Sequence, residues 1–195
     1  MSRKSNPDRV TQILEAAGVV FAQTGLEATR MDDIAAAAGV SKGALYLYFK
    51  NKDALIIALG EQIFSRELAG YREALNVSGS IRERLQALTR AVVSDLDRFR
   101  QLQPLLYEFF ALSQRYPQAR QILQTFFDQS VGILKQVVED GIARGEIRAA
   151  DPVQAALALG AQVDGILLWQ PYHPATVDLE AQINFGFELV LKALQ

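Results

Sequence analysis

The amino-acid sequence predicts an all-α protein in which a small helix-turn-helix unit precedes a larger helical bundle. Apolar residues recur at helical spacing through almost the whole chain, and no stretch alternates apolar and polar residues as a strand does. Three short helical segments occupy roughly the first fifty residues, whereas the later segments are much longer. With 195 residues, 50% of them hydrophobic, the chain can bury a core without disulfides or metals.

The first two predicted helices have clear start and stop signals. The first begins at Pro7, carries apolar residues at helical spacing, and ends at Gly25, a residue type that favours helix termination. Thr29 and Asp32 match a capping box, which predicts that a second short helix, "MDDIAAAA", starts there. Gly39 ends this second helix.

The third predicted helix lies in the segment "SKGALYLYFKNK". Ser41 is a good N-cap, and residues 42–49 contain no proline. A tight turn with a glycine joins this helix to the second one, which is the pattern of a helix-turn-helix. On a helical wheel Leu45 and Phe49 share one apolar face, so we expect both side chains to be buried against the first two helices.

The opposite side of the third helix has an unusual composition for a surface. It carries Gly43, Ala44 and Leu47, flanked by Lys42, Tyr46 and Tyr48. Small residues let a backbone approach DNA base edges, leucine or alanine can contact a thymine methyl, and lysine and tyrosine reach phosphates. Lys52 would add another phosphate contact. The alternative is an ordinary packed helix with a solvated charged edge. A net charge of +2 in residues 1–52, against −4 in the remainder, weakly favours DNA.

The segment "TRMDDIAAAAGVSKGALYLYFKNKDAL", residues 29–55, resembles the DNA-binding signature of the TetR family of bacterial transcriptional regulators. The resemblance is specific over about residues 8–60, and the rest of the chain is similar only in length and helical texture. It implies a homodimer that binds a palindromic double-stranded operator and releases it when a small-molecule effector binds the second domain. By motif position it implies DNA contacts at Ser41, Lys42, Gly43, Ala44, Tyr46, Leu47, Tyr48 and Lys52, with further contacts at Thr29, Arg30 and Met31.

One residue departs from the pattern of that family. Arg30 stands where members often have a serine or threonine cap, so we expect the cap to move to Thr29.

The remainder of the chain predicts a bundle of antiparallel neighbours, because long helical segments alternate with short breaks. The expected helices span about residues 52–76, 80–101, 103–115, 117–144, 152–170 and 176–194, with breaks marked by Gly, Pro or polar clusters, including one at Pro104. We therefore divide the chain into a helix-turn-helix DNA-binding domain, residues 1–51, and a helical ligand-binding and dimerisation domain, residues 52–195.

The second domain is rich in aromatic residues and poor in charges at helical core positions. If it holds an effector, a largely apolar or aromatic small molecule would suit it. Asp164 stands out on an apolar helix, where it could face a pocket, pair across a dimer or reach water at an interface edge. Candidate ligand contacts are Phe64, Tyr107, Phe110, Phe127, Gln162, Asp164 and Trp169.

The last two helices are apolar around much of their circumference, more than one domain needs. We expect them to pair with the same helices of a second chain in a four-helix bundle. Candidate interface residues are Ala155, Leu159, Ile166, Ile183, Phe187 and Val190.

The sequence lacks the residues that metal-binding and catalytic proteins usually need. There is no cysteine, which fits a reducing cytosol, and the single histidine, His173, falls in an expected loop, so neither a metal site nor a catalytic site is predicted. We expect no cofactor, no enzyme activity, no secretory signal and no membrane span, hence a cytoplasmic protein. The predicted function is a ligand-released transcriptional repressor. The alternatives are an architectural or protein-interaction helix-turn-helix module without an effector, and a helical enzyme with an incidental helix-turn-helix.

Overall fold

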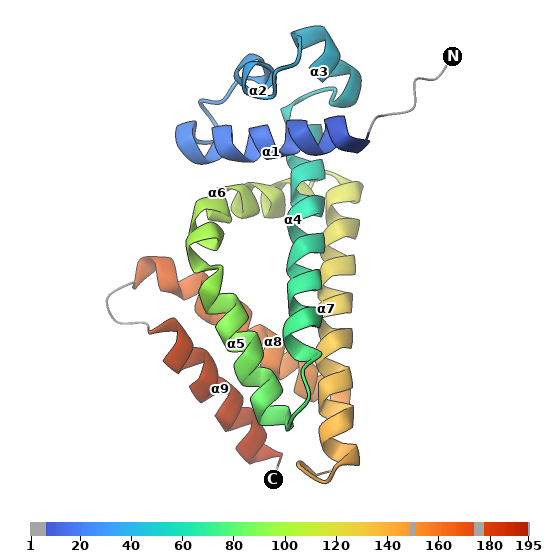
Figure 1. Cartoon of the computed structure of the whole chain (residues 1–195), viewed down its shortest axis with the longest axis vertical. Helices are drawn as coiled ribbons and strands as arrows, with labels where there is room; N and C mark the ends of the chain where they lie inside the picture. The colour runs from blue at the N-terminus through green and yellow to red at the C-terminus, as the bar shows by residue number, and fades with distance from the viewer. Residues whose placement is uncertain (1–6, 149–150, 174–177, 195) are drawn as a thin grey trace. The chain divides into compact units, whose positions relative to one another are not determined.

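The computed structural model describes residues 7–148, 151–173 and 178–194, and every regular element in these ranges is a helix (Figure 1). The all-α prediction is confirmed. The elements are α1 (Pro7–Thr24), α2 (Met31–Ala37), α3 (Lys42–Tyr48), α4 (Lys52–Leu75), α5 (Ile81–Ser94), α6 (Leu96–Ser113), α7 (Pro117–Ala143), α8 (Pro152–Trp169), the 3-10 turn η1 (Gln170–Tyr172) and α9 (Leu179–Ala193).

The chain forms two compact units. The first unit consists of residues 1–65 and 98–123, and the second of residues 66–97 and 124–195. Helix α4 therefore contributes residues to both units. These units are defined by packing. The predicted division of function, with DNA binding in residues 1–51 and ligand binding and dimerisation in residues 52–195, stays a prediction.

Helices α1, α2 and α3 pack together in the first unit (Figure 1). Gly25 follows α1 with a φ of 78°, and its N–H donates to the Phe21 carbonyl at 2.9 Å. Gly39 follows α2 with a φ of 60°. Both angles lie in the left-handed region that glycine adopts without strain, which is why the helices end there. Leu45 and Phe49 are buried, as predicted from the wheel.

One predicted helix break differs from the structure. The expected break at Pro104 is wrong: this proline lies inside α6, and the break falls at Asp95. There the Ser94 hydroxyl donates to the Ala91 carbonyl at 2.8 Å, a local bond that competes with continued helix. The expected start of the last helix at residue 176 lies outside the described residues, and α9 begins at Leu179 behind its N-cap Asp178.

A close helix contact in the first unit depends on glycine. A Cβ atom at Gly60 of α4 would collide with the ring of Phe109, which is fully buried in α6 and packs edge-on against Phe64. We expect Gly60→Ala to lower the free energy of unfolding by about 2 kcal/mol, although alanine is the better helix former. Gly70→Ala on the same helix has open space around the new methyl and should stabilise by about 0.5–1 kcal/mol. Urea unfolding of both variants checks this, and equal shifts would contradict it.

In the second unit α8 lies beside α9, and α9 lies beside α5 (Figure 1). This packing buries most of the candidate interface residues on the last two helices. Four of the candidate interface residues are buried within a single chain: Ala155, Leu159, Ile183 and Phe187. Their side chains belong to the chain's own core and offer little further surface to a partner. The other two candidates, Ile166 and Val190, are half-buried.

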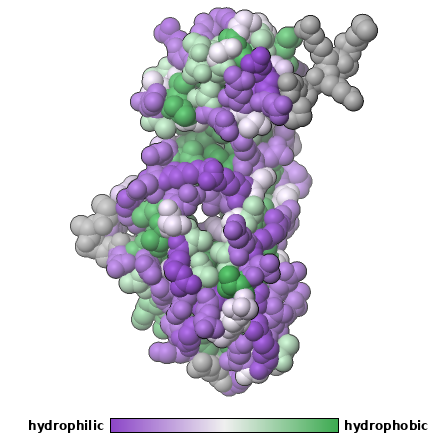
Figure 2. Space-filling model, in the orientation of Figure 1, coloured by the Kyte–Doolittle hydropathy of each residue, from purple (hydrophilic) through white to green (hydrophobic). Residues whose placement is uncertain are grey.

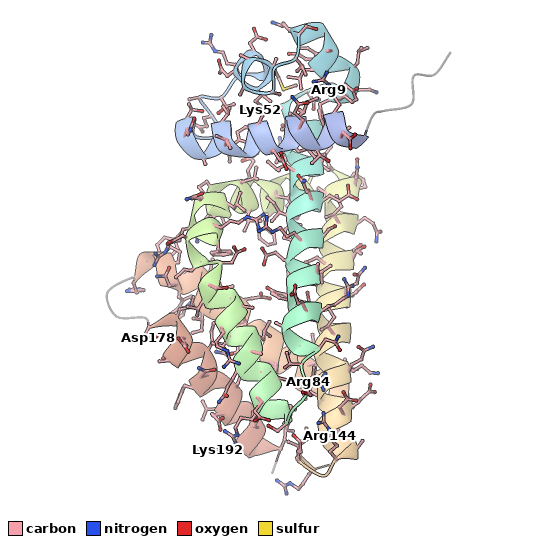
Figure 3. The ribbon with its side chains drawn as sticks, viewed as in Figure 1. Arg9, Lys52, Arg84, Arg144, Asp178 and Lys192 are labelled. Atoms are coloured by element: carbon pink, nitrogen blue, oxygen red, sulfur yellow. The ribbon has the colours of Figure 1, made fainter. Side chains whose placement is uncertain are left out.

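Polar side chains hold the connections at one end of the second unit (Figure 3). Arg84 donates to the Asp140 carboxylate at 2.8 Å, and Arg144 donates to the Gly79 carbonyl at 2.6 Å. Ser80 and Glu83 form a reciprocal capping box at the start of α5, and these hydrogen bonds lower the pKa of Glu83. Polar residues cover much of the face shown in Figure 2. Among the described residues, no helix combines the length and apolar character that a bilayer span requires.

Candidate DNA-binding surface and effector pocket

The loop between α1 and α2 is fixed by threonine hydroxyls. Thr29 is 2% exposed, and its Oγ1 donates to the Gly25 carbonyl at 2.6 Å and lies 2.6 Å from Oγ1 of Thr24. The Thr29 hydroxyl is therefore occupied and does not cap α2. The predicted box of Thr29 with Asp32 is wrong by one residue: the Asp33 carboxylate accepts from the Arg30 N–H at 2.8 Å, and Arg30 is the N-cap residue.

Lys52 is held by the same loop (Figure 3). Its Nζ donates to the carbonyl oxygens of Leu26 at 2.6 Å and Thr29 at 3.3 Å. The ammonium group therefore joins the start of α4 to the loop that precedes α2. The sequence predicts a phosphate contact for this lysine. In the structure its ammonium group makes two internal hydrogen bonds, which a phosphate would have to replace or share.

We expect Lys52→Ala to lower the free energy of unfolding by about 1–2 kcal/mol, because two carbonyl groups lose a charged donor. Lys50→Ala is the matched control, since Lys50 is exposed and precedes the same helix. Thermal unfolding of the two variants checks this expectation. Equal stability of both, with a reduced salt slope of DNA binding only for Lys52→Ala, would instead assign Lys52 to phosphate alone.

Helix α3 is positioned by its N-cap and presents its outer face to solvent. The Ser41 hydroxyl accepts from the Ala44 N–H at 3.1 Å, as the sequence predicted. Leu47 is 77% exposed, an unusual state for leucine, and Tyr46 is exposed as well. Nothing lies within 4 Å of a Cβ built on Gly43, so this side of the helix is open.

The remaining candidate DNA contacts differ in how accessible they are. Lys42 is exposed and pairs with Asp32 at 2.9 Å, and this carboxylate, by its hydrogen bond and then by its charge, raises the pKa of Lys42. Arg30 is exposed at the start of α2, whereas Met31 is buried and Tyr48 is half-buried. The structure thus brings Lys42, Tyr46 and Leu47 to the outer surface of one short helix.

A pocket lies in the second unit, between α4, α5, α7 and α8. It is a small recess, partly open to solvent, with a cavity volume of about 40 Å³. Its walls are mostly apolar, with Tyr71, Phe126 and Phe127 as the aromatic members and Ser130 and Asp164 as the other polar members. Of the seven ligand-contact candidates, Phe127 and Asp164 line it.

The other ligand-contact candidates lie elsewhere. Phe64, Tyr107 and Phe110 belong to the first unit. The Gln162 side chain packs over Gly186 and donates to the Gln182 carbonyl at 3.2 Å, and Trp169 is 64% exposed. Their roles as effector contacts stay predictions. Sequence reasoning missed Tyr71, Phe126 and Ser130 as pocket residues. Tyr71 and Phe126 are aromatic, which is typical of pocket linings, but aromatic residues are equally common in a helical core.

Two groups in the pocket have shifted proton affinities. Burial raises the pKa of Asp164 from 3.8 to about 6, although more than a third of the residue's surface is exposed. Burial, followed by the charges of Glu67 and Asp164, raises the pKa of Tyr71 well above its usual value, so Tyr71 stays protonated at neutral pH. The ionised form of Asp164 is thus disfavoured in the pocket.

We therefore expect the stability conferred by Asp164 to depend on pH. Its pKa is higher in the folded chain, so folding is favoured below about pH 4 and weakened as pH rises through about 6. Asp164→Asn should stabilise the protein at pH 8 by about 1 kcal/mol, a figure reduced for solvent screening, and have little effect at pH 4. Unfolding curves at both pH values check this, and a gain only at pH 4 would contradict it.

Metal binding finds no support in the described part of the chain. No group of three or more His, Asp or Glu residues there could hold a metal ion. His173 lies exposed directly after η1.

Comparisons with known proteins agree with this geometry. Residues 13–59 match the family described as bacterial regulatory proteins, tetR family, and residues 81–194 match the family described as BetI-type transcriptional repressor, C-terminal. The chain is 32% identical over 192 residues to the HTH-type transcriptional regulator TtgR of Pseudomonas putida, covering 92% of this chain and 90% of that one. It is 31% identical over 170 residues to YhgD of Bacillus subtilis, an uncharacterized HTH-type transcriptional regulator, covering 86% and 87%.

A solved structure is also similar over almost the whole length. The transcriptional regulator FadR of Bacillus subtilis, in complex with stearoyl-CoA, aligns with a TM-score of 0.74 and 26% identity, covering 95% of this chain and 99% of that one. The exposed recognition face of α3, the two family matches and these relatives converge on one conclusion. The chain belongs to the TetR family of bacterial regulatory proteins and is a DNA-binding transcriptional regulator.

Proposed function

We propose that this regulator is a homodimeric repressor that binds a palindromic operator through α3 and leaves it when a small apolar or aromatic molecule occupies the second unit. DNA binding through α3 is supported by the exposure of Leu47, an apolar side chain that lies in solvent on a short, capped helix. Exposed leucine has no use in the fold of the single chain, whereas it can contact a thymine methyl in the major groove.

Residues of the helix-turn-helix divide into contacting and supporting roles. Gly43, Ala44 and Leu47 approach the bases, since α3 is open around Gly43, Leu47 is exposed and Ala44 is half-buried. Lys42 and Tyr46 reach phosphates, for which Lys42 exchanges Asp32 for a phosphate oxygen. Ser41 caps the helix, and Thr29 and Lys52 hold the loop before α2 in place.

The dimer surface we propose is the exposed side of α8 and α9, in place of the buried residues expected from the sequence. Leu157 and Leu168 lie eleven residues apart and therefore on nearly the same side of α8. Phe185 and Leu189 lie one turn apart on α9. These large apolar side chains are all exposed in the single chain, and pairing with a second copy would remove them from water.

The effector part rests on the pocket in the second unit and on a relative. The FadR structure contains stearoyl-CoA, so a TetR-like fold of similar length accommodates a small molecule. A ligand releases DNA only if it binds the DNA-incompetent arrangement more tightly than the competent one. The proposal places the protein in the cytoplasm, where bacterial DNA is, and needs no catalytic step.

The test is a titration of the protein–operator complex with apolar aromatic compounds. Anisotropy of labelled operator follows release, and emission of Trp169, the single tryptophan, follows changes in the second unit. We expect at least one compound to change both signals over the same concentration range. If every compound that binds leaves the operator affinity unchanged, the architectural alternative without an effector is favoured.

A further inference from the structure

We propose that the pocket of the second unit selects a lipophilic cation, a protonated amine on an apolar or aromatic body, with Asp164 as its counter-ion. This inference rests on the proposed function, because it names the chemical class of the effector. It also separates this chain from a regulator whose ligand carries an anionic head group.

The charges that line the pocket have one sign. In the described part of the chain, no lysine, arginine or histidine lines it, and Asp164 is the only lining residue that becomes charged near neutral pH. A carboxylate or phosphate placed in the recess would face Asp164 without a cation to offset the repulsion. An ammonium group would gain a charge-assisted hydrogen bond in surroundings that screen it less than water does.

Aromatic rings surround the same space. The ring centroids of Phe126 and Phe127 are 5.4 Å apart with a T-shaped arrangement, and those of Tyr71 and Phe126 are 6.5 Å apart. All three rings line the pocket together with Asp164. Ring faces attract cations, and a carboxylate within an aromatic lining binds a lipophilic cation better than it binds a neutral molecule of equal size.

Ser130 adds a second polar group to the pocket wall. Its Oγ, on α7, is buried and has no hydrogen-bond partner among the described residues. Buried hydroxyl groups are normally paired, so this Oγ is an unused acceptor in the pocket wall, which can accept an N–H from a bound amine once its side chain turns toward the recess. Ser130 and Asp164 thus supply acceptors on two different helices, which favours a ligand with more than one N–H.

The partners of Asp164 set the expected pH dependence of binding. On helix α4, Tyr71 faces the charges of both Asp164 and Glu67. Burial and then both charges raise the pKa of Tyr71, so Tyr71 stays neutral and does not compete with an amine for Asp164. Helices α5 and α7 contribute no titratable side chain to the pocket lining. An amine should therefore bind more weakly at pH 5, where Asp164 is protonated, than at pH 7.5.

The experiment compares three probes that differ only in head group: 4-phenylbutylamine, its neutral analogue pentylbenzene, and 5-phenylpentanoate. Calorimetry at pH 7.5 should show the amine binding at least about 10-fold more tightly than the other two, which is the ratio that one desolvated ion pair of about 1.4 kcal/mol provides. Asp164→Asn should abolish this preference and leave pentylbenzene binding unchanged. Asp128→Asn, which removes the same charge from an exposed position on α7, should preserve the preference.

The outcomes separate this inference from the proposed function. Equal binding of all three probes, no binding of any, or a preference that survives Asp164→Asn in a folded variant would overturn the cation selectivity. Operator release is measured in the same samples. If the amine binds through Asp164 without releasing DNA, the selectivity stands and the effector role fails. If the neutral or anionic probe releases DNA as well as the amine does, the effector role stands and the selectivity fails.

Discussion

Aspartate at both Phe185 and Leu189 is expected to separate the dimer into folded monomers and to weaken operator binding by about 100-fold or more, since a monomer loses the avidity of two linked half-site contacts. The two side chains are 58% and 53% exposed in the single chain, so the monomer fold has no need of them. In a helix-pair interface they would be covered, and four buried carboxylates per dimer would oppose association.

Two controls make this expectation specific. Val77→Asp changes an exposed apolar residue of the same unit that lies outside α8 and α9, so the dimer should persist. Phe187→Asp, by contrast, places a charge at a position that is buried in the core and should unfold the second unit. Sedimentation reports the oligomeric state and far-ultraviolet circular dichroism reports the helix content, so together they distinguish the double variant from Val77→Asp and Phe187→Asp. A Phe185→Asp, Leu189→Asp variant that still sediments as a dimer would exclude this face as the interface.

Leu47→Glu is expected to reduce operator affinity by about 100-fold while leaving the melting temperature unchanged. Leu47 is 77% exposed, so the fold loses almost nothing. At the DNA the new carboxylate would replace an apolar contact and would face phosphates and base acceptors.

Leu47→Met is the matched control, because it keeps an apolar side chain of similar volume and should bind the operator within a few-fold of the parent. Lys42→Ala should act differently, weakening all sequences about equally and lowering the salt slope by roughly one. Anisotropy measured at several salt concentrations separates these effects. If Leu47→Glu binds the operator as tightly as the parent, α3 does not enter the groove by this face.

The sequence was sufficient wherever local chemistry decides the structure. Ser41 caps α3, Gly25 and Gly39 end α1 and α2, and the period of the apolar residues places Leu45 and Phe49 inside. It was insufficient where a side chain has two possible partners. The Thr29 hydroxyl could cap α2 or bond the preceding loop, and only the folded loop shows that it bonds Gly25.

The interface and pocket residues of the second unit could not be predicted for a similar reason. Helix α8 is apolar around most of its circumference, so periodicity could not tell which side faces its own core and which side faces outward. The structure places Leu159 inside and Leu157 outside, two residues apart. The pocket combines Tyr71, Phe126 and Asp164 from three helices distant in sequence, and no local pattern links them.

Selection of double-stranded DNA from a random library by the purified protein tests operator recognition most directly. A dimer that reads DNA through α3 should enrich one palindrome, with half-site centres about 34–36 Å apart or a multiple of that spacing, and Leu47→Glu should enrich none. Enrichment of a sequence without two-fold symmetry, or identical enrichment by the parent and Leu47→Glu, would contradict operator recognition by a dimer through α3.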